Sequence, residues 1–119
     1  MLVIEGKSGK SIVLAHYIDG LYKRTINSDL LIIDSVGISH VFGDRIDFCN
    51  LSKDVELKDF SKFYKDNWKS FQYTNYLILS LNAPKEILKD LKVIEEEYEK
   101  EIIVTVQNNK KDKVEVYKI

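Results

Sequence analysis

Residues 1–11 read Met-Leu-Val-Ile-Glu-Gly-Lys-Ser-Gly-Lys-Ser, and this stretch decides the fold that the sequence predicts. A short apolar run, Met1–Ile4, leads directly into a turn with two glycines, and a helical pattern follows at once. A strand, a glycine-bearing turn, Gly-Lys-Ser and a helix start are the parts of a phosphate-binding loop. The match is incomplete, because only two residues separate Gly6 from Gly9 where the full motif has four.

The composition is that of one globular domain, residues 1–119, with 45% hydrophobic and 31% charged residues. A net charge of −1 gives no general electrostatic case for nucleic acid or a membrane as partner. The single cysteine, Cys49, excludes an intramolecular disulfide, and no Cys/His spacing suggests zinc. No apolar stretch approaches the roughly 20 residues that span a bilayer, and no signal-peptide pattern precedes the first strand, so we expect a cytoplasmic location.

Apolar periodicity predicts strands alternating with helices. The segments from 30 to 33, 76 to 79 and 102 to 106 are continuously apolar or β-branched, as expected of strands buried on both faces. The last segment alternates, as an edge or final strand would. The predicted strands are Leu2–Ile4, Leu30–Ile33, Tyr76–Leu79, Ile102–Val106 and Val114–Ile119.

Three helical patterns lie between these strands, at Ser11–Tyr22, at about Leu57–Phe71 and from Pro84 to about Tyr98. Residues 35–56 favour a loop or a short hairpin. The apolar faces predicted for the first and third helices are Ile12, Leu14, Ala15, Ile18 and Leu21 or Tyr22, and Ile87, Leu88, Leu91, Ile94 and Tyr98. The expected fold class is α/β, a three-layer sandwich with a mostly parallel central sheet of about five strands.

Together these segments resemble a minimal and degenerate RecA-like P-loop NTPase, and the fold class is expected to be P-loop NTPase-like. The resemblance is specific at Gly6–Ser11, which looks like a Walker A element, and generic elsewhere. It implies a catalytic carboxylate at Asp34 and a polar sensor at Gln107 and Asn108, two residues that could instead simply open a turn. Ser80 stands where a Walker B acid would be expected.

A second alignment takes Leu30–Asp34 as the Walker B strand and so keeps the acid. It leaves only 23 residues between Lys10 and Asp34, which hardly admits a helix and another strand, and we prefer the first alignment.

The candidate cofactor-binding residues are Gly6, Lys7, Ser8, Gly9, Lys10, Ser11 and Gln107. Lys10 would neutralise phosphate oxygens beside the N–H groups of the helix start. Ser11 would place its hydroxyl on Mg²⁺, or would simply cap the helix. Asp34, a general base or a ligand of metal-bound water, ends a strand on the same edge of the sheet, or it opens a turn.

Two functions are predicted from these features. The first is binding of ATP or a similar nucleotide with Mg²⁺, with weak or no hydrolysis. The second is a degenerate domain that has lost the nucleotide and acts as a protein-interaction module, favoured by the shortened loop and the aromatic cluster between Phe60 and Tyr76. A protein partner or a homo-oligomer is compatible with both functions. If hydrolysis occurs, an arginine from a neighbouring subunit or partner would assist it, and Arg45 is the candidate for this role.

Overall fold

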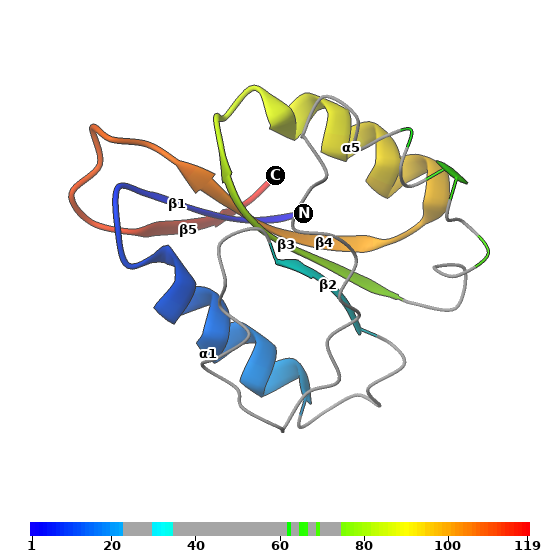
Figure 1. Cartoon of the computed structure of the whole chain (residues 1–119), viewed down its shortest axis with the longest axis horizontal. Coiled ribbons are helices and arrows are strands. Elements are labelled where there is room, and N and C mark those ends of the chain that lie inside the picture. The colour runs from blue at the N-terminus through cyan, green and yellow to red at the C-terminus, as the bar shows by residue number, and fades with distance from the viewer. Residues whose placement is uncertain (23–29, 35–61, 63–64, 67–68, 70–74) are drawn as a thin grey trace.

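The computed structural model describes residues 1–22, 30–34, 62, 65–66, 69 and 75–119. Figure 1 shows a twisted sheet with helices on both of its sides. The elements in chain order are β1 (Leu2–Gly6), α1 (Lys10–Tyr22), β2 (Leu30–Asp34), β3 (Tyr76–Ala83), α5 (Ile87–Tyr98), β4 (Glu101–Gln107) and β5 (Glu115–Lys118).

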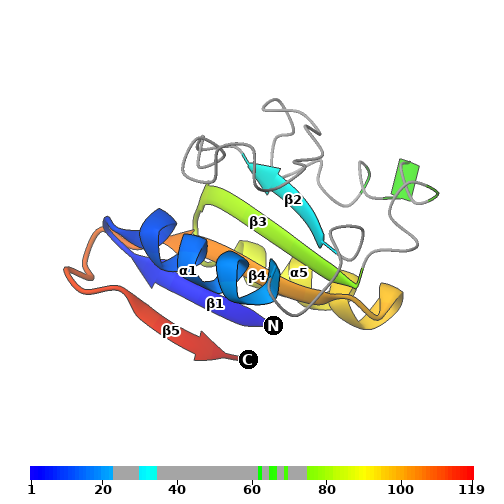
Figure 2. The same cartoon turned by 90° about the horizontal axis from the view of Figure 1, so that it is seen from below.

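The strands form one sheet in the order β2-β3-β4-β1-β5. The pairs β2–β3, β3–β4 and β4–β1 are parallel, and β5 runs antiparallel to β1 at the edge. Figure 2 shows β5 beside β1 and β2 at the opposite edge. Gly6 is level with Gln107 across the β1–β4 pair, so the turn after β1 lies next to the end of β4.

Helix α1 covers one face of the sheet. Its buried residues Leu14, Ala15, Ile18 and Leu21 follow helical spacing and cluster with apolar residues from three strands. The prediction that Ile12 belongs to this face is wrong, because Ile12 is 66% exposed. It lies two residues before Leu14, about 200° around the helix from it, and so points away from the sheet.

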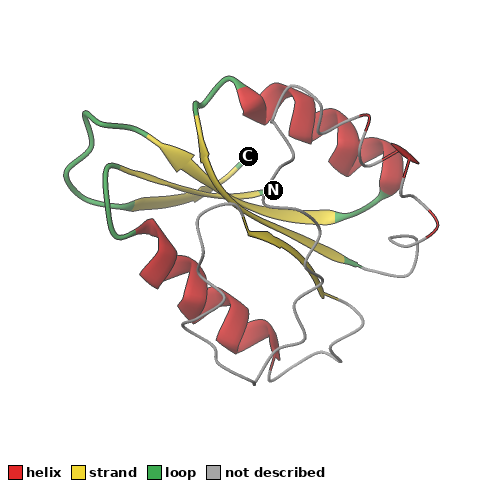
Figure 3. Ribbon diagram, viewed as in Figure 1, coloured by secondary structure: helices red, strands yellow, loops and turns green. Residues whose placement is uncertain are grey.

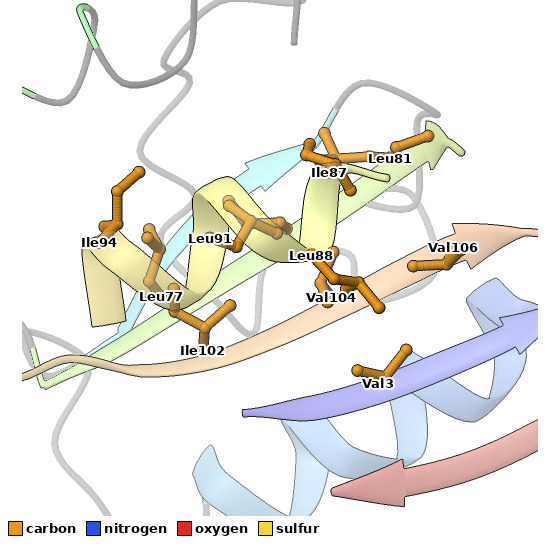
Figure 4. Packing of buried hydrophobic residues seen from close by; sticks show 12 residues of the cluster. Val3, Leu77, Leu81, Ile87, Leu88, Leu91, Ile94, Ile102, Val104 and Val106 are labelled. Carbon is orange, nitrogen blue, oxygen red and sulfur yellow. The ribbon is translucent and has the colours of Figure 1, made fainter. Parts of the chain in front are cut away.

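Helix α5 covers the other face. Ile87, Leu88, Leu91 and Ile94 are buried, and Figure 4 shows them directed at side chains of β3 and β4. Tyr98 is partly buried against the same cluster, so the predicted apolar face of this helix is confirmed. The helix ends at Glu99, whose φ of 52° is left-handed and turns the chain into β4.

The predicted fold class, a three-layer P-loop NTPase-like sandwich on a mostly parallel sheet, is wrong. The sheet is mixed, because β5 runs antiparallel to β1. The helices whose bounds the structure describes are α1 and α5, which lie on opposite faces of this mixed sheet (Figure 3). The connection after β4 spans only residues 108–114, too short for the crossover that parallel strands need. The last strand therefore has to return antiparallel.

The positions of the single strands and helices were predicted more accurately than the fold class. All five predicted strand segments coincide with observed strands, and two of the three helical patterns coincide with α1 and α5. Of the pattern at 57–71 the structure describes residues 62, 65–66 and 69, which are helical. The segment 35–56, with Arg45, lies outside the described residues, as does most of the aromatic cluster.

Replacement of Leu91 by Ala should lower the free energy of unfolding by about 3 kcal/mol, because Leu91 is completely buried between α5 and the sheet. Chemical denaturation of the purified variant measures this loss. Val93→Ala on the same helix is the matched control and should stay within about 0.5 kcal/mol, because Val93 is 59% exposed. Equal losses for both variants would contradict the packing of α5 shown in Figure 4.

Candidate functional site

The candidate site is the turn Gly6–Lys10, which joins the end of β1 to the start of α1. Gly9 has a φ of 84°, a conformation that side chains rarely adopt. A Cβ atom on Gly6 would lie 3.2 Å from Cγ2 of Val114 and 3.3 Å from its Cα. Both glycines are therefore required by the local backbone and packing, independently of any ligand.

A second turn, residues 108–113 between β4 and β5, lies against the first one, as Figures 1 and 3 show. The Asn108 N–H donates to the Gly6 carbonyl at 2.9 Å, and the Lys7 N–H donates to the Lys111 carbonyl at 3.0 Å. These bonds fix the loop from outside. They also mean that the Lys7 N–H already has an acceptor and is not free to bind an anion.

Lys10, the first residue of α1, folds its side chain back over the loop. Its ammonium donates to the Gly6 carbonyl at 3.1 Å, to the Lys7 carbonyl at 3.4 Å and to Oε1 of Gln107 at 2.5 Å. The residue is only 6% exposed, and burial lowers the pKa of its amine below the ordinary 10.5. All three of these acceptors are neutral oxygens.

Gln107 ends β4 and is brought to Lys10 from 97 positions away in the sequence. Its Nε2 donates to the Lys7 carbonyl at 2.9 Å and to Oδ1 of Asn109 at 2.7 Å. The structure therefore brings Lys10 and Gln107 into contact, two residues that were predicted for the same site from separate parts of the sequence. Ser11 is also at this place, as the second residue of α1, and is partly buried.

Asp34 is not brought to the loop. It ends β2, paired with Ser80 on β3, and both β3 and β4 separate β2 from β1. Three strand spacings put its backbone about 14 Å from that of β1. A catalytic role for Asp34 stays a prediction, and the turn residues Gly6–Ser11 have no backbone contact with it through the sheet.

Sequence reasoning missed a second polar cluster, centred on Glu5. This glutamate is only 1% exposed, although it sits in the buried strand β1. Tyr117 donates its hydroxyl to Oε1 at 2.6 Å, and Asn108 donates Nδ2 to Oε2 at 2.9 Å. A charged residue inside an otherwise apolar strand was the signal that could have revealed it, because buried carboxylates require partners.

Two lysines complete the surroundings of Glu5. Lys85 Nζ lies 3.7 Å from Oε1 and 5.8 Å from the centre of the Tyr117 ring, and Lys111 Nζ lies 3.5 Å from Oε2. Lys111 also pairs with Glu115, the residue opposite Glu5 on β5, and so offsets repulsion between the two carboxylates. The cluster ties β1, β5 and both flanking turns together.

These contacts shift the pKa values of Glu5 and Tyr117. Burial alone would raise the pKa of Glu5, but the hydrogen bonds from Tyr117 and Asn108 and the charges of Lys85 and Lys111 outweigh it and lower the pKa below 4.5. For Tyr117, burial is the largest cause, and the hydrogen bond and charge of Glu5 add to it. Together they raise the pKa of Tyr117 to about 12.

Other features lie away from the loop. A hollow of about 430 Å³ opens at the opposite end of the sheet, lined by Leu2, Tyr17, Leu21, Tyr76, Glu101, Ile103 and Lys118. It is remote from Lys10 and Gln107. Among the residues that the structure describes, no group of three or more His, Cys, Asp or Glu side chains is placed to hold a metal ion.

Comparisons with protein-family models, with curated proteins and with solved structures found no match for this chain. Within the described ranges, no helix is both long and apolar enough to cross a membrane. Function is therefore inferred from the residues and their geometry alone.

Replacement of Tyr117 by Phe should lower the free energy of unfolding at neutral pH by about 2 kcal/mol, the scale of one hydrogen bond to a charged group. The folded-state pKa of Glu5 is lowered, so the stability that it contributes is complete above the ordinary value of 4.5 and is lost as the pH falls through the lowered one. The loss caused by Tyr117→Phe should therefore shrink in acid.

Urea denaturation of both proteins from neutral to acid pH measures this difference. Tyr17→Phe is the control, since Tyr17 is 40% exposed, and its effect should stay within about 0.5 kcal/mol at every pH. A loss for Tyr117→Phe that is the same at all pH values would show that its hydroxyl does not depend on an ionised Glu5.

Proposed function

We propose that the loop Gly6–Ser11 binds the phosphates of a nucleotide such as ATP, together with Mg²⁺, and that turnover is weak or absent. The observation that carries this proposal is the state of Lys10. Its ammonium is buried at the start of a helix, and its acceptors among the described residues are neutral oxygens.

A buried ammonium that lacks an anionic partner is costly, because neutral oxygens replace only part of its hydration. Glu5 shows the contrast within the same chain, since two lysines surround that buried carboxylate. A phosphate oxygen at Lys10 would supply the missing negative charge. Buried ionisable groups whose pKa is shifted by burial, as that of Lys10 is, are often found at functional sites.

The start of α1 adds backbone donors at the same place. The bond from the Val13 N–H to the Gly9 carbonyl is an i→i−4 bond of the first turn. The N–H groups of Lys10 and Ser11 precede it and carry the positive end of the helix dipole. In this proposal they face the phosphate, and the Ser11 hydroxyl helps to hold Mg²⁺.

Two features argue for weak chemistry. The strand β3 carries the neutral Ser80 beside Asp34, and the backbone of Asp34 is three strands from the loop. In addition, the Lys7 N–H is committed to Lys111, so the short loop offers few donors to a phosphate chain. A nucleotide bound here would be held mainly by Lys10 and the helix start. A cytoplasmic location belongs to the same proposal.

One observation favours the second candidate, an interaction module without nucleotide. The Lys10 ammonium and the Lys7 N–H both have acceptors within the chain, so the loop keeps its shape without a ligand. In that case the loop serves as a structural joint between β1 and α1, and the partner binds elsewhere on the domain.

Calorimetric titration with ATP, ADP and GTP in the presence of Mg²⁺ separates these candidates. We expect saturable binding to the wild type and a loss of at least about tenfold in affinity for Lys10→Ala, because a charge-assisted bond to phosphate disappears. Lys7→Ala is the matched control. It removes the same charge from an exposed position in the same loop and should weaken binding much less.

Unfolding curves must show that all three proteins are folded. Absence of binding by any nucleotide to the folded wild type would contradict the nucleotide proposal and favour the interaction module. Equal losses for Lys7→Ala and Lys10→Ala would show that only general electrostatic attraction operates.

A further inference from the structure

The ammonium of Lys10 has no hydrogen to spare. An ammonium carries three donors, and Lys10 has three acceptors, namely the Gly6 carbonyl, the Lys7 carbonyl and Oε1 of Gln107. The contact with Gln107 is the shortest, at 2.5 Å. A phosphate oxygen can approach this ammonium only if one of the three acceptors leaves.

Gln107 is equally committed. Its oxygen accepts from Lys10, and its two amide hydrogens are taken up by the Lys7 carbonyl and Oδ1 of Asn109. The orientation of the carboxamide follows from chemistry, because an NH₂ group facing an ammonium would place two donors together. The side chain is thus held in one position by the loop that it closes.

The three acceptors differ in how easily they can leave. The carbonyls of Gly6 and Lys7 belong to the backbone of the loop, and the Gly6 carbonyl is also fixed by the Asn108 N–H. Gln107 reaches Lys10 through a side chain, whose rotation moves no backbone atom. It is the acceptor that a ligand can displace without moving the backbone, although its bonds to the Lys7 carbonyl and Asn109 then have to break as well.

We propose that Gln107 is an internal competitor that occupies the phosphate position on Lys10 and keeps the loop closed in the free protein. The inference rests on the proposed function, since the competition is with a phosphate group at this same site. Gln107 is a positioning residue in this scheme, and it lowers affinity by stabilising the unliganded state.

The opposite role makes the opposite prediction. If Gln107 instead donated its amide to a bound phosphate, as the sequence resemblance implies for a sensor, removing the side chain would weaken binding. As a competitor, its removal strengthens binding. The sign of the change therefore decides between the two roles, and a merely structural role would not produce a gain in affinity.

Titration of pyrophosphate without metal tests the proposal on the wild type and on Gln107→Ala and Gln107→Glu. Gln107→Ala should bind about tenfold more tightly, the scale of one hydrogen bond to a charged group. Gln107→Glu should bind at least about tenfold more weakly, because its carboxylate pairs with Lys10 and repels the probe. Glu101→Gln, an exposed change at the other end of β4, is the control and should leave affinity unchanged.

Binding by Gln107→Ala alone, lost again in the double variant with Lys10→Ala, would also support the competitor role. Equal or weaker binding by Gln107→Ala, while wild-type binding still depends on Lys10, would overturn the competitor role and leave the proposed function standing. No binding by any of the folded variants would overturn both. If Gln107→Ala does not fold, the near-isosteric Gln107→Glu decides, since unchanged affinity for that variant contradicts the inference.

Discussion

The candidate site depends on two backbone hydrogen bonds that tie the end of β1 to the turn before β5. One joins the Asn108 N–H to the Gly6 carbonyl, and the other joins the Lys7 N–H to the Lys111 carbonyl. Because β1 lies inside the sheet, its end cannot move far, and these bonds fix the direction in which the chain enters α1. The position of Lys10 over the loop and its contact with Gln107 both follow from that direction.

The two buried charged residues of this region, Glu5 and Lys10, lie in different surroundings. Val3 packs on the α5 side and Ile4 on the α1 side, so alternation along the strand places Glu5 on the α5 side. Glu5 is balanced there by two lysines and two hydrogen-bond donors. Lys10, at the start of α1, has neutral acceptors. This imbalance distinguishes a structural cluster from a place where an anion would be stabilised.

Much of the element order was predictable because continuous apolar segments such as Ile102–Val106 need burial on both faces wherever they lie. The mixed architecture of the sheet was not predictable in this way. The antiparallel direction of β5 follows from the short connection between β4 and β5, and the apolar pattern carries no information about strand direction. Ile12 was misplaced for a related reason, since an apolar residue at the start of a helix fits two neighbouring faces until packing selects one.

At the candidate site, too, single residues were predictable from the sequence, whereas the contacts between them were not. Lys10 could be named from a local motif, and Gln107 from its place at a strand end, but their contact is a product of the sheet order. The Glu5 cluster was missed because its partners Tyr117 and Asn108 are more than 100 positions away along the chain. No short sequence window contains both members of such a pair.

The separation along the chain has a consequence for biosynthesis. The residues that shape the loop, Gln107 to Lys111, are synthesised long after the loop itself, because 97 positions separate Lys10 from Gln107. Contacts between distant parts of a chain form late, since the connecting segment must first be ordered. On the ribosome, the loop therefore acquires its final form only after β4 and the turn that follows it have been synthesised, and a nascent chain that ends before Gln107 would carry the motif without the site.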